Sequence, residues 1–160
     1  EAGGITMMDA WYTTSAQTHS TGVQLFDSNW DRLSAESAKK MTNIGSAMSE
    51  SSGVWTFPET GKYWIQFKSY FNGNGNTYYA GLKIYNADDE ILNTAFTNRF
   101  AATIYPWPHS WAMAMTFLDV DDTTDNKCKV KLSSQQGSTS VWYSSSDMQT
   151  SAFFIRMGDS

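Results

Sequence analysis

The stretch from Ser52 to Phe67 reads SGVWTFPETGKYWIQF and decides the fold. Two short segments in which apolar and polar residues alternate, Val54 to Phe57 and Lys62 to Phe67, flank a Pro-Glu-Thr-Gly break. Alternation with a period of two is typical of strands that bury one face, and Pro and Gly end and restart such strands. The stretch therefore predicts two strands joined by a tight turn, a β-hairpin around which the rest of the chain is arranged.

Similar short segments recur on both sides of this stretch, separated by turns rich in Asn, Gly and Asp, residues that tolerate positive φ. The regular spacing predicts an all-β fold, a two-sheet antiparallel sandwich or jelly roll. We expect the central strand at Gly61 to Phe71 and further strands at Ile5 to Tyr12, Val23 to Phe26, Tyr78 to Tyr85, Ile91 to Phe96, Ser110 to Val120, Lys127 to Leu132 and Ser151 to Met157.

Two segments do not follow this pattern. Residues Arg32 to Met48 contain SAESAKKM, which fits either two helical turns or a long surface excursion. Residues Ser133 to Gln149 are expected to form a polar loop that carries an apolar island, Val141 to Tyr143.

The bulk composition limits the classes of protein. At 160 residues, the chain is long enough for one domain with a real core, so we expect a single domain over residues 1–160. Aromatic residues make up 15% of the chain, which favours β structure. Only 17% of the residues are charged, and such a hydroxyl-rich and amide-rich surface suits a secreted or particle-bound protein.

Charge argues against a nucleic-acid partner, because the formal net charge is −5 and phosphate binding needs clustered Lys and Arg. The one basic cluster, Lys127, Lys129 and Lys131, alternates along a predicted strand and is interpreted as a solvated face. No apolar run is long enough for a membrane span, and no signal peptide is visible. Cys128 is the only cysteine, which excludes an intrachain disulfide and predicts a buried thiol.

The stretch from Ser52 to Ile65 resembles the central part of complement C1q-like and tumour-necrosis-factor-like jelly rolls, in which S-G-x-F-x-x-P-x-x-G-x-Y precedes an alternating strand. The ending SAFFIRMGD, from Ser151 to Asp159, is similar to the last strand of that family. The family normally has Gly before its second aromatic residue, so the departure at Ala152 to Phe154 leaves the register of this strand open. The segment Asn29 to Arg32 and the FIRMGD ending are most similar to structural proteins of marine bacteriophages.

This resemblance implies a jelly roll of about ten strands that assembles as a homotrimer and buries aromatic and aliphatic side chains along the threefold axis. The residues support such an assembly independently. Strands that are apolar on both faces, such as Trp111 to Leu118 and Phe153 to Met157, exceed what one core needs, and surplus apolar surface marks an interface. The candidates for core or trimer interface are Tyr63, Tyr79, Trp111, Met113, Met115, Phe154 and Arg156.

Carboxylates alternate at Asp119, Asp121 and Asp125, as they do in calcium loops. The calcium pattern fails because Thr124 stands where Gly is required and Val130 stands where a bidentate Glu is required. An acidic turn is the preferred interpretation, although some C1q-like trimers bind calcium near their apex.

Aromatic residues cluster in two predicted loops. One holds Tyr105, Trp107 and His109, and the other holds Trp142 and Tyr143. Such rings would grip the flat face of a sugar, or they would staple long loops to the sandwich or to a neighbouring protein. Both interpretations stay open.

No catalytic motif appears in the sequence. His19 and His109 lie far apart, without a metal-ligand spacing. Glu50 and Glu59 offer the pair of carboxylates that a glycosidase uses, but a chain this polar supplies such pairs by chance. We therefore expect neither an enzyme nor a cofactor nor a metal ion, and a carbohydrate-active enzyme is the third-ranked hypothesis.

The sequence as a whole predicts a trimeric structural protein on the surface of a virus particle, of the capsid-decoration or head-fibre type, with residues 1–20 as an anchoring strand or arm. Its expected partners are copies of itself and other virion proteins, with no nucleic acid and no membrane. The alternative is a tail-fibre knob that binds a host-surface glycan or protein through its loops.

Overall fold

The computed structural model describes residues 4–19, 22–33, 43–73, 80–96, 109–125, 129–136, 141–143 and 149–160. These residues contain thirteen strands and no helix. The strands are β1 (Met7–Thr13), β2 (Gln17–His19), β3 (Gly22–Leu25), β4 (Trp30–Arg32), β5 (Ser49–Ser51), β6 (Val54–Thr56), β7 (Gly61–Gly73), β8 (Ala80–Asn86), β9 (Ile91–Phe96), β10 (His109–Val120), β11 (Lys129–Gln136), β12 (Val141–Tyr143) and β13 (Ser151–Gly158).

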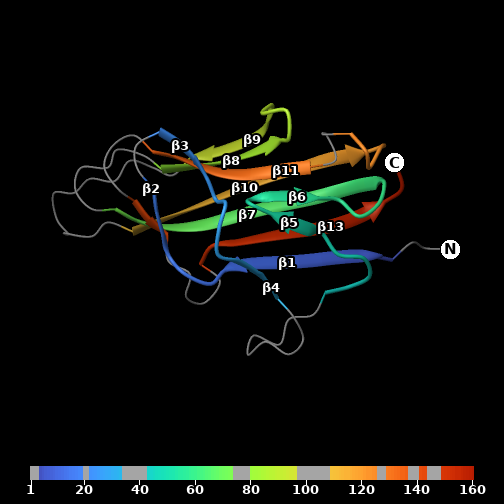
Figure 1. Cartoon of the computed structure of the whole chain (residues 1–160), viewed down its shortest axis with the longest axis horizontal. Coiled ribbons are helices and arrows are strands. Elements are labelled where there is room, and N and C mark those ends of the chain that lie inside the picture. The colour runs from blue at the N-terminus through green and yellow to red at the C-terminus, as the bar shows by residue number, and fades with distance from the viewer. Residues whose placement is uncertain are drawn as a thin grey trace.

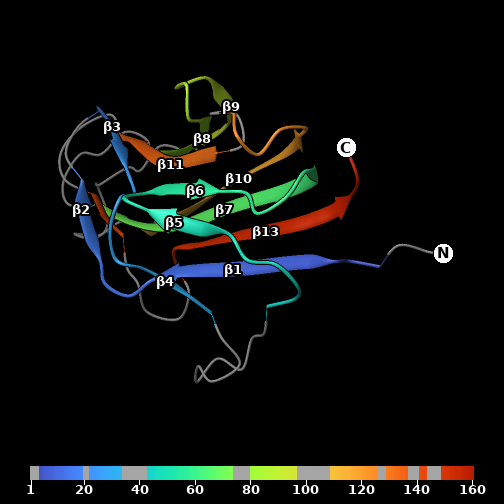
Figure 2. The ribbon, with the colours of Figure 1, turned by 45° about the vertical axis from the view of Figure 1, so that its right-hand side comes forward.

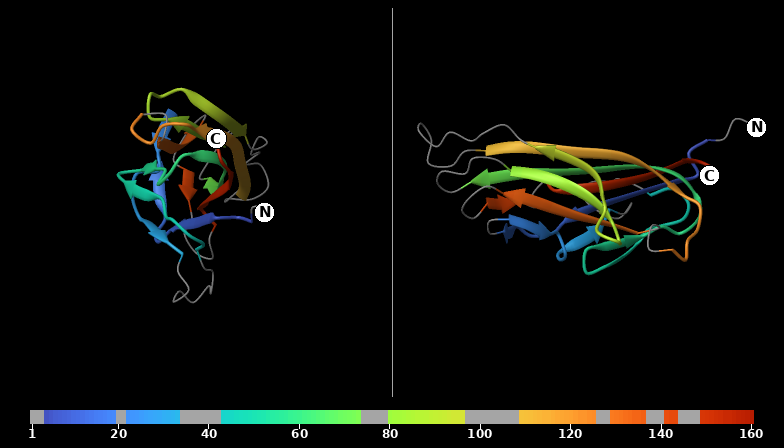
Figure 3. Two further views of the ribbon diagram at one scale, coloured as in Figure 1. Left: turned by 90° about the vertical axis from the view of Figure 1, so that its right-hand side faces the viewer. Right: turned by 90° about the horizontal axis from the view of Figure 1, so that it is seen from above.

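The strands form two sheets that run along the long axis of the molecule (Figures 1 and 3). In the seven-stranded sheet, β7 pairs with β10 on one side and with β13 and β12 on the other, β1 and β4 follow β13, and β2 follows β12. The six-stranded sheet has the order β5-β6-β11-β8-β9, and β3 also pairs with β11. Among the described residues, all strand pairs are antiparallel, so the predicted two-sheet antiparallel fold is confirmed.

The predicted hairpin between Val54 and Phe67 is wrong. Strand β6 pairs with β5 and β11 in one sheet, whereas β7 belongs to the other sheet, so residues 57–60 carry the chain from sheet to sheet (Figure 2). In both segments, buried residues do alternate with more exposed ones. This alternation shows which side chains face the core between the sheets, but it does not show which strands pair with each other.

The hairpin that does form joins β5 to β6. Its two-residue turn is Ser52-Gly53, with φ of 51° and 78°, and Ser51 pairs with Val54 across it. Positive φ at both central residues matches the right-handed twist of the flanking strands. The Glu50 carboxylate accepts a hydrogen bond of 2.7 Å from the backbone N–H of Gly53 and fixes the turn.

Aromatic side chains from both sheets fill the core around Trp55, which is fully buried. The Trp55 ring lies 4.8 Å from that of Trp30 and 6.3 Å from that of Trp11, both edge to face, and 6.0 Å from that of Phe154. Edge-to-face contacts between buried rings add about 1 kcal/mol each beyond the burial of area. The core thus ties the six-stranded sheet to β1, β4 and β13.

A buried carboxylate joins β1 to β4 and to the segment before β5. Asp9 has no exposed surface, and its Oδ1 lies 3.0 Å from Nε of Arg32. Its Oδ2 accepts hydrogen bonds from the Trp11 indole N–H, at 3.0 Å, and from the backbone N–H of Met48, at 2.8 Å. Burial raises the pKa of Asp9, while these donors act to lower it, so the carboxylate depends on all three of its partners.

Several predicted loops differ in the structure. Val141–Tyr143 is strand β12 and pairs with β7 and β2, so this apolar island is part of a sheet. Gln17–His19, in a segment with no predicted strand, is strand β2. Of the segment from Arg32 to Met48, residues 34–42 lie outside the described part, and residues 43–48 contain no helix. Cys128 also lies outside the described part of the chain. Lys131, from the predicted basic cluster, forms an ion pair of 2.8 Å with Asp89.

Gly61 is expected to tolerate no side chain. Its φ is +147°, and a Cβ there would lie 2.7 Å from the carbonyl oxygen of Gly158 and 2.5 Å from Nε of Arg156. Gly61→Ala should lower the free energy of unfolding by about 1 to 3 kcal/mol because of this strain. Gly158→Ala is the control, because nothing lies within 4 Å of its Cβ position. Equal denaturant midpoints for the two variants would contradict the structure of this turn.

Candidate assembly surface

Strand β10 directs its large side chains away from the core. Ala112 and Ala114 point inward and are buried. Four large apolar side chains on the opposite face stay exposed, Trp111 at 50%, Met113 at 47%, Met115 at 41% and Phe117 at 74%. Four such residues at alternate positions form one stripe, because successive side chains of a strand point to opposite faces.

The register of the sheet extends this stripe across three further strands. Phe117 lies opposite Trp64 of β7, Trp64 lies opposite Ile155 of β13, and Ile155 lies opposite Met8 of β1. A second row runs in the same way from Met115 through Gln66 and Phe153 to Ala10. We call the outer side of the β10-β7-β13-β1 sheet the apolar face, and its members are Met8, Trp64, Trp111, Met113, Met115, Phe117, Phe153 and Ile155.

Charged groups lie at one end of the apolar face and also within it. At the end, Nζ of Lys62 lies 3.8 Å from a carboxylate oxygen of Asp119, and both side chains are more than half exposed. Opposite Met113, Nζ of Lys68 lies 5.1 Å from the centre of the Trp111 ring, which packs against Tyr70 at 4.8 Å. A shallow cavity of about 350 Å³ opens there beside Met113. An apolar centre with a polar rim is the usual organisation of a protein interface.

The structure separates the predicted core-or-interface residues into three groups. Trp111, Met113 and Met115 lie on the apolar face. Tyr63 and Phe154 are fully buried in the core, and the Tyr63 hydroxyl donates a hydrogen bond of 2.8 Å to the backbone oxygen of Glu59. Burial, and secondarily the charge of Glu59, raises the pKa of Tyr63 to about 12, so this phenol stays protonated at physiological pH.

The third group is Arg156, which lies at one end of the sandwich. Its guanidinium joins three segments there. Its Nε donates to the backbone oxygen of Thr60 at 3.0 Å, and its Nη1 donates to the Thr6 hydroxyl at 3.1 Å. Its Nη2 pairs with Asp159 at 2.6 Å. These contacts give Arg156 a role in closing the end of the fold. Tyr79 lies outside the described residues.

The structure describes only part of the other predicted sites. Tyr105 and Trp107 lie outside the described residues, and the backbones of His109, Trp142 and Tyr143 pair with β7. Among the described residues, no three Asp, Glu, His or Cys side chains gather as a metal site would require. Asp119 is paired with Lys62, while Asp121 and Asp125 are exposed in the turn after β10. Glu50 and Glu59 serve different elements, because Glu50 fixes the β5–β6 turn and Glu59 lies near Arg156.

Trp64, Phe117, Phe153 and Ile155 are absent from the predicted candidates, although they belong to the apolar face. The alternation places Trp64 and Phe117 on the outer side of their strands, but only the register shows that they are neighbours.

The solved structures to which this chain is similar include proteins of two kinds. The chain is similar to Eiger TNF from S. frugiperda, with a TM-score of 0.68 and 13% identity over 98% of this chain and 96% of that one. It is similar to murine APRIL at pH 5.0, with a TM-score of 0.65 and 10% identity over 94% of this chain and 98% of that one. It is also similar to PRD1 vertex protein P5, with a TM-score of 0.56 and 13% identity over 98% of this chain and 100% of that one.

At these identities, the similarity establishes a tumour-necrosis-factor-like jelly roll, which confirms the predicted fold. No protein-family model and no curated protein sequence matches the chain. In the described part of the chain, no helix has the length and hydropathy needed to cross a membrane.

Phe117 tests whether the apolar face is a contact surface. Phe117→Lys should weaken self-association tenfold or more, about 1.4 kcal/mol, because burying an unpaired ammonium among apolar side chains is costly. Sedimentation velocity over a concentration series measures the effect. Val23→Lys is the matched control, since Val23 is also exposed, at 48%, but lies on β3, which pairs with β11 in the other sheet. Equal dissociation constants for wild type and Phe117→Lys would exclude the apolar face.

Proposed function

We propose that the protein is a non-enzymatic structural module of a virus particle, a single jelly-roll domain that forms homotrimers through its apolar face. In this proposal it lies on the virion surface, as a capsid-decoration or head-fibre protein. Its partners are two further copies of itself and the virion proteins to which it is anchored.

The single observation that carries the self-association is the apolar face itself. The exposed side chains of Trp111, Met113, Met115 and Phe117 lie along β10, and one cross-strand row continues from Phe117 through Trp64 and Ile155 to Met8. A contiguous apolar surface of this kind on a folded domain is typical of a contact site, because exposing it to water is unfavourable. The number of copies, three, comes from the sequence resemblance to C1q-like and tumour-necrosis-factor-like proteins.

The viral role is supported by two similarities. One is the sequence resemblance of Asn29 to Arg32 and of the FIRMGD ending to structural proteins of marine bacteriophages. The other is the structural similarity to a vertex protein of PRD1. Both resembling segments hold the fold together in this chain, since Trp30 packs on Trp55, Arg32 pairs with Asp9, and Arg156 pairs with Asp159.

The proposed anchor is the N-terminal end. Strand β1 is built into the sheet between β13 and β4, so Met7 and the residues after it are already paired. Anchoring to a capsid or fibre would therefore fall to residues before Met7. This end lies beside the end of β13, because Met7 pairs with Arg156.

The test is the location of the protein on purified particles of the virus that encodes it. Antibody labelling in electron microscopy and quantitative mass spectrometry should find it on the particle surface, in copy numbers divisible by three. Absence from purified particles would overturn the structural role. Labelling at the tip of a tail fibre, with loss of host binding when the antibody is bound, would replace this proposal with the receptor-binding knob.

A further inference from the structure

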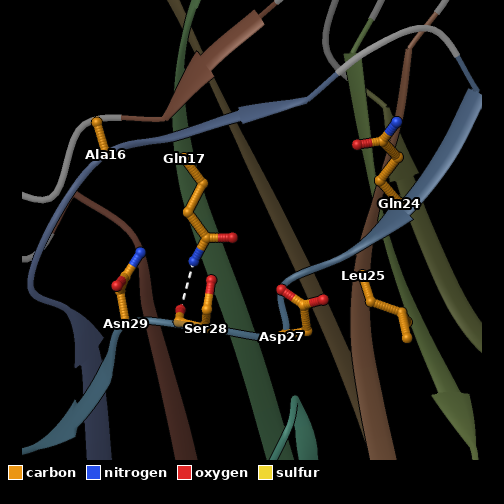
Figure 4. A pocket seen from close by; sticks show the side chains of 7 residues that line it. All are labelled: Ala16, Gln17, Gln24, Leu25, Asp27, Ser28 and Asn29. Carbon is orange, nitrogen blue, oxygen red and sulfur yellow. Dashed lines mark hydrogen bonds between the residues drawn. The ribbon is translucent and has the colours of Figure 1, made fainter.

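A polar cleft lies at the edge opposite to β10, where the two sheets separate. It has a volume of about 560 Å³ and lies between β2, β3 and the β3–β4 loop. Figure 4 shows Gln17 on one side of it, Gln24 and Leu25 on the other, and Asp27, Ser28 and Asn29 along its floor. None of these residues belongs to the apolar face.

The loop that forms the floor of the cleft is held by hydrogen bonds to its backbone, one of them from the Gln17 side chain that lines the cleft (Figure 4). Three of its carbonyl oxygens accept hydrogen bonds. The Phe26 oxygen accepts one of 2.8 Å from the Trp30 indole N–H, and the Ser28 oxygen accepts one from the Gln17 amide. The Asn29 oxygen accepts one of 2.8 Å from the backbone N–H of Thr14. These bonds hold the backbone in place, so the exposed side chains of Asp27, Ser28 and Asn29 start from a rigid base. A ligand that binds there would lose little affinity to ordering of the loop.

Close packing on the β5–β6 turn adds to this rigidity. A Cβ on Gly53 would lie 2.7 Å from Cα of Asp27, so the two backbones touch. The backbone N–H of Phe26 also donates to the oxygen of Leu132 at 2.9 Å, which ties the loop to β11. Asp27 is therefore presented by the folded sandwich in a single backbone position.

The lining residues exclude three classes of ligand. An anion is disfavoured, because Asp27 is negative, no described Lys or Arg lines the cleft, and the net charge of the chain is −5. Calcium needs six to eight oxygen ligands, usually with several carboxylates, and Asp27 is the one carboxylate among the described lining residues. An apolar ligand would cover the exposed polar side chains of Asp27, Ser28 and Asn29 without forming hydrogen bonds to them.

We infer that this cleft binds a neutral saccharide unit. A carboxylate accepts hydrogen bonds from two neighbouring hydroxyls, which suits Asp27 to a pair of sugar hydroxyls. Amide side chains both donate and accept, as sugar hydroxyls do, so Gln24 and Asn29 match the same ligand. Leu25, 38% exposed at the wall, offers an apolar contact for the C–H groups of the ring. The cleft volume lies within the range of small-molecule sites.

The proposed saccharide site does not depend on the proposed assembly. Its residues come from β2, β3 and the β3–β4 loop, whereas the apolar face is built from β10, β7, β13 and β1. Failure of one proposal therefore leaves the other standing, and the two are tested by different variants.

The test is titration of ¹⁵N-labelled full-length protein with glucose, galactose, mannose and N-acetylglucosamine, followed by amide chemical shifts, with a glycan array for larger neutral and acidic glycans. We expect a neutral sugar to shift the amides of residues 24–29 and not those of β10. Asp27→Ala and Gln24→Ala should each weaken binding at least tenfold. Asp121→Ala is the control. It removes an exposed carboxylate from the turn after β10, which does not line the cleft, and it should leave binding unchanged.

Three results would overturn the inference. One is the absence of a shift with every sugar at millimolar concentration, together with no neutral glycan bound on the array. Another is binding that is the same in wild type and Asp27→Ala, with both variants folded by their amide spectra. The third is equal or tighter binding of N-acetylneuraminic acid, or a change in the chemical shifts of the same amides when calcium alone is added. Either result would mean that the cleft binds an ion.

Discussion

The alternation of small and large side chains along β10 is the constraint on which the rest of the structure depends. Strand β7 already fills its side of the core with Tyr63, Ile65 and Phe67. Protein interiors are packed nearly as densely as crystals, and beside Ser69 and Phe67 strand β10 adds only the small side chains of Ala112 and Ala114, while Leu118 and Val120 pack on the core further along the strand. Because successive side chains of a strand point to opposite faces, Trp111, Met113, Met115 and Phe117 then point outward. The same alternation that completes the core therefore also creates the apolar face.

The two sides of the sandwich are thereby given different chemistry. The outer face of the β10 sheet is broad and mostly apolar, with Lys62 and Asp119 at one end and Lys68 opposite Met113, and it suits contact with another protein surface. The side with β2 and β3 holds a polar cleft whose floor is fixed by hydrogen bonds to Trp30, Gln17 and Thr14. In our proposals, the domain assembles through the outer face of the β10-β7-β13-β1 sheet and presents the cleft between β2 and β3 to a ligand. The buried Asp9 contacts join β1 to β4 and to the segment before β5.

Local pattern in the sequence was sufficient to predict the all-β fold and most strands, because alternation reports burial directly. It failed at the hairpin, since Trp55 and Tyr63 face the same core from opposite sheets and alternate in the same way as partners in one sheet would. The dipeptide Ser52-Gly53 was the available signal for the true turn. For the apolar face, the sequence indicated the outer side of β10, but the neighbours Trp64 and Ile155 follow only from register. The polar cleft has no local signature, because Gln17, Gln24 and Asp27 meet through tertiary contacts.

The mass of the wild-type protein in solution tests the central claim most directly. Light scattering coupled to size-exclusion chromatography, at micromolar concentration and moderate salt, should give three times the mass of one chain. That mass should persist when salt is raised, because apolar contacts are not screened as ion pairs are. A mass equal to one chain over the whole concentration range would contradict the account, since the apolar face would then be stable in water without a second copy.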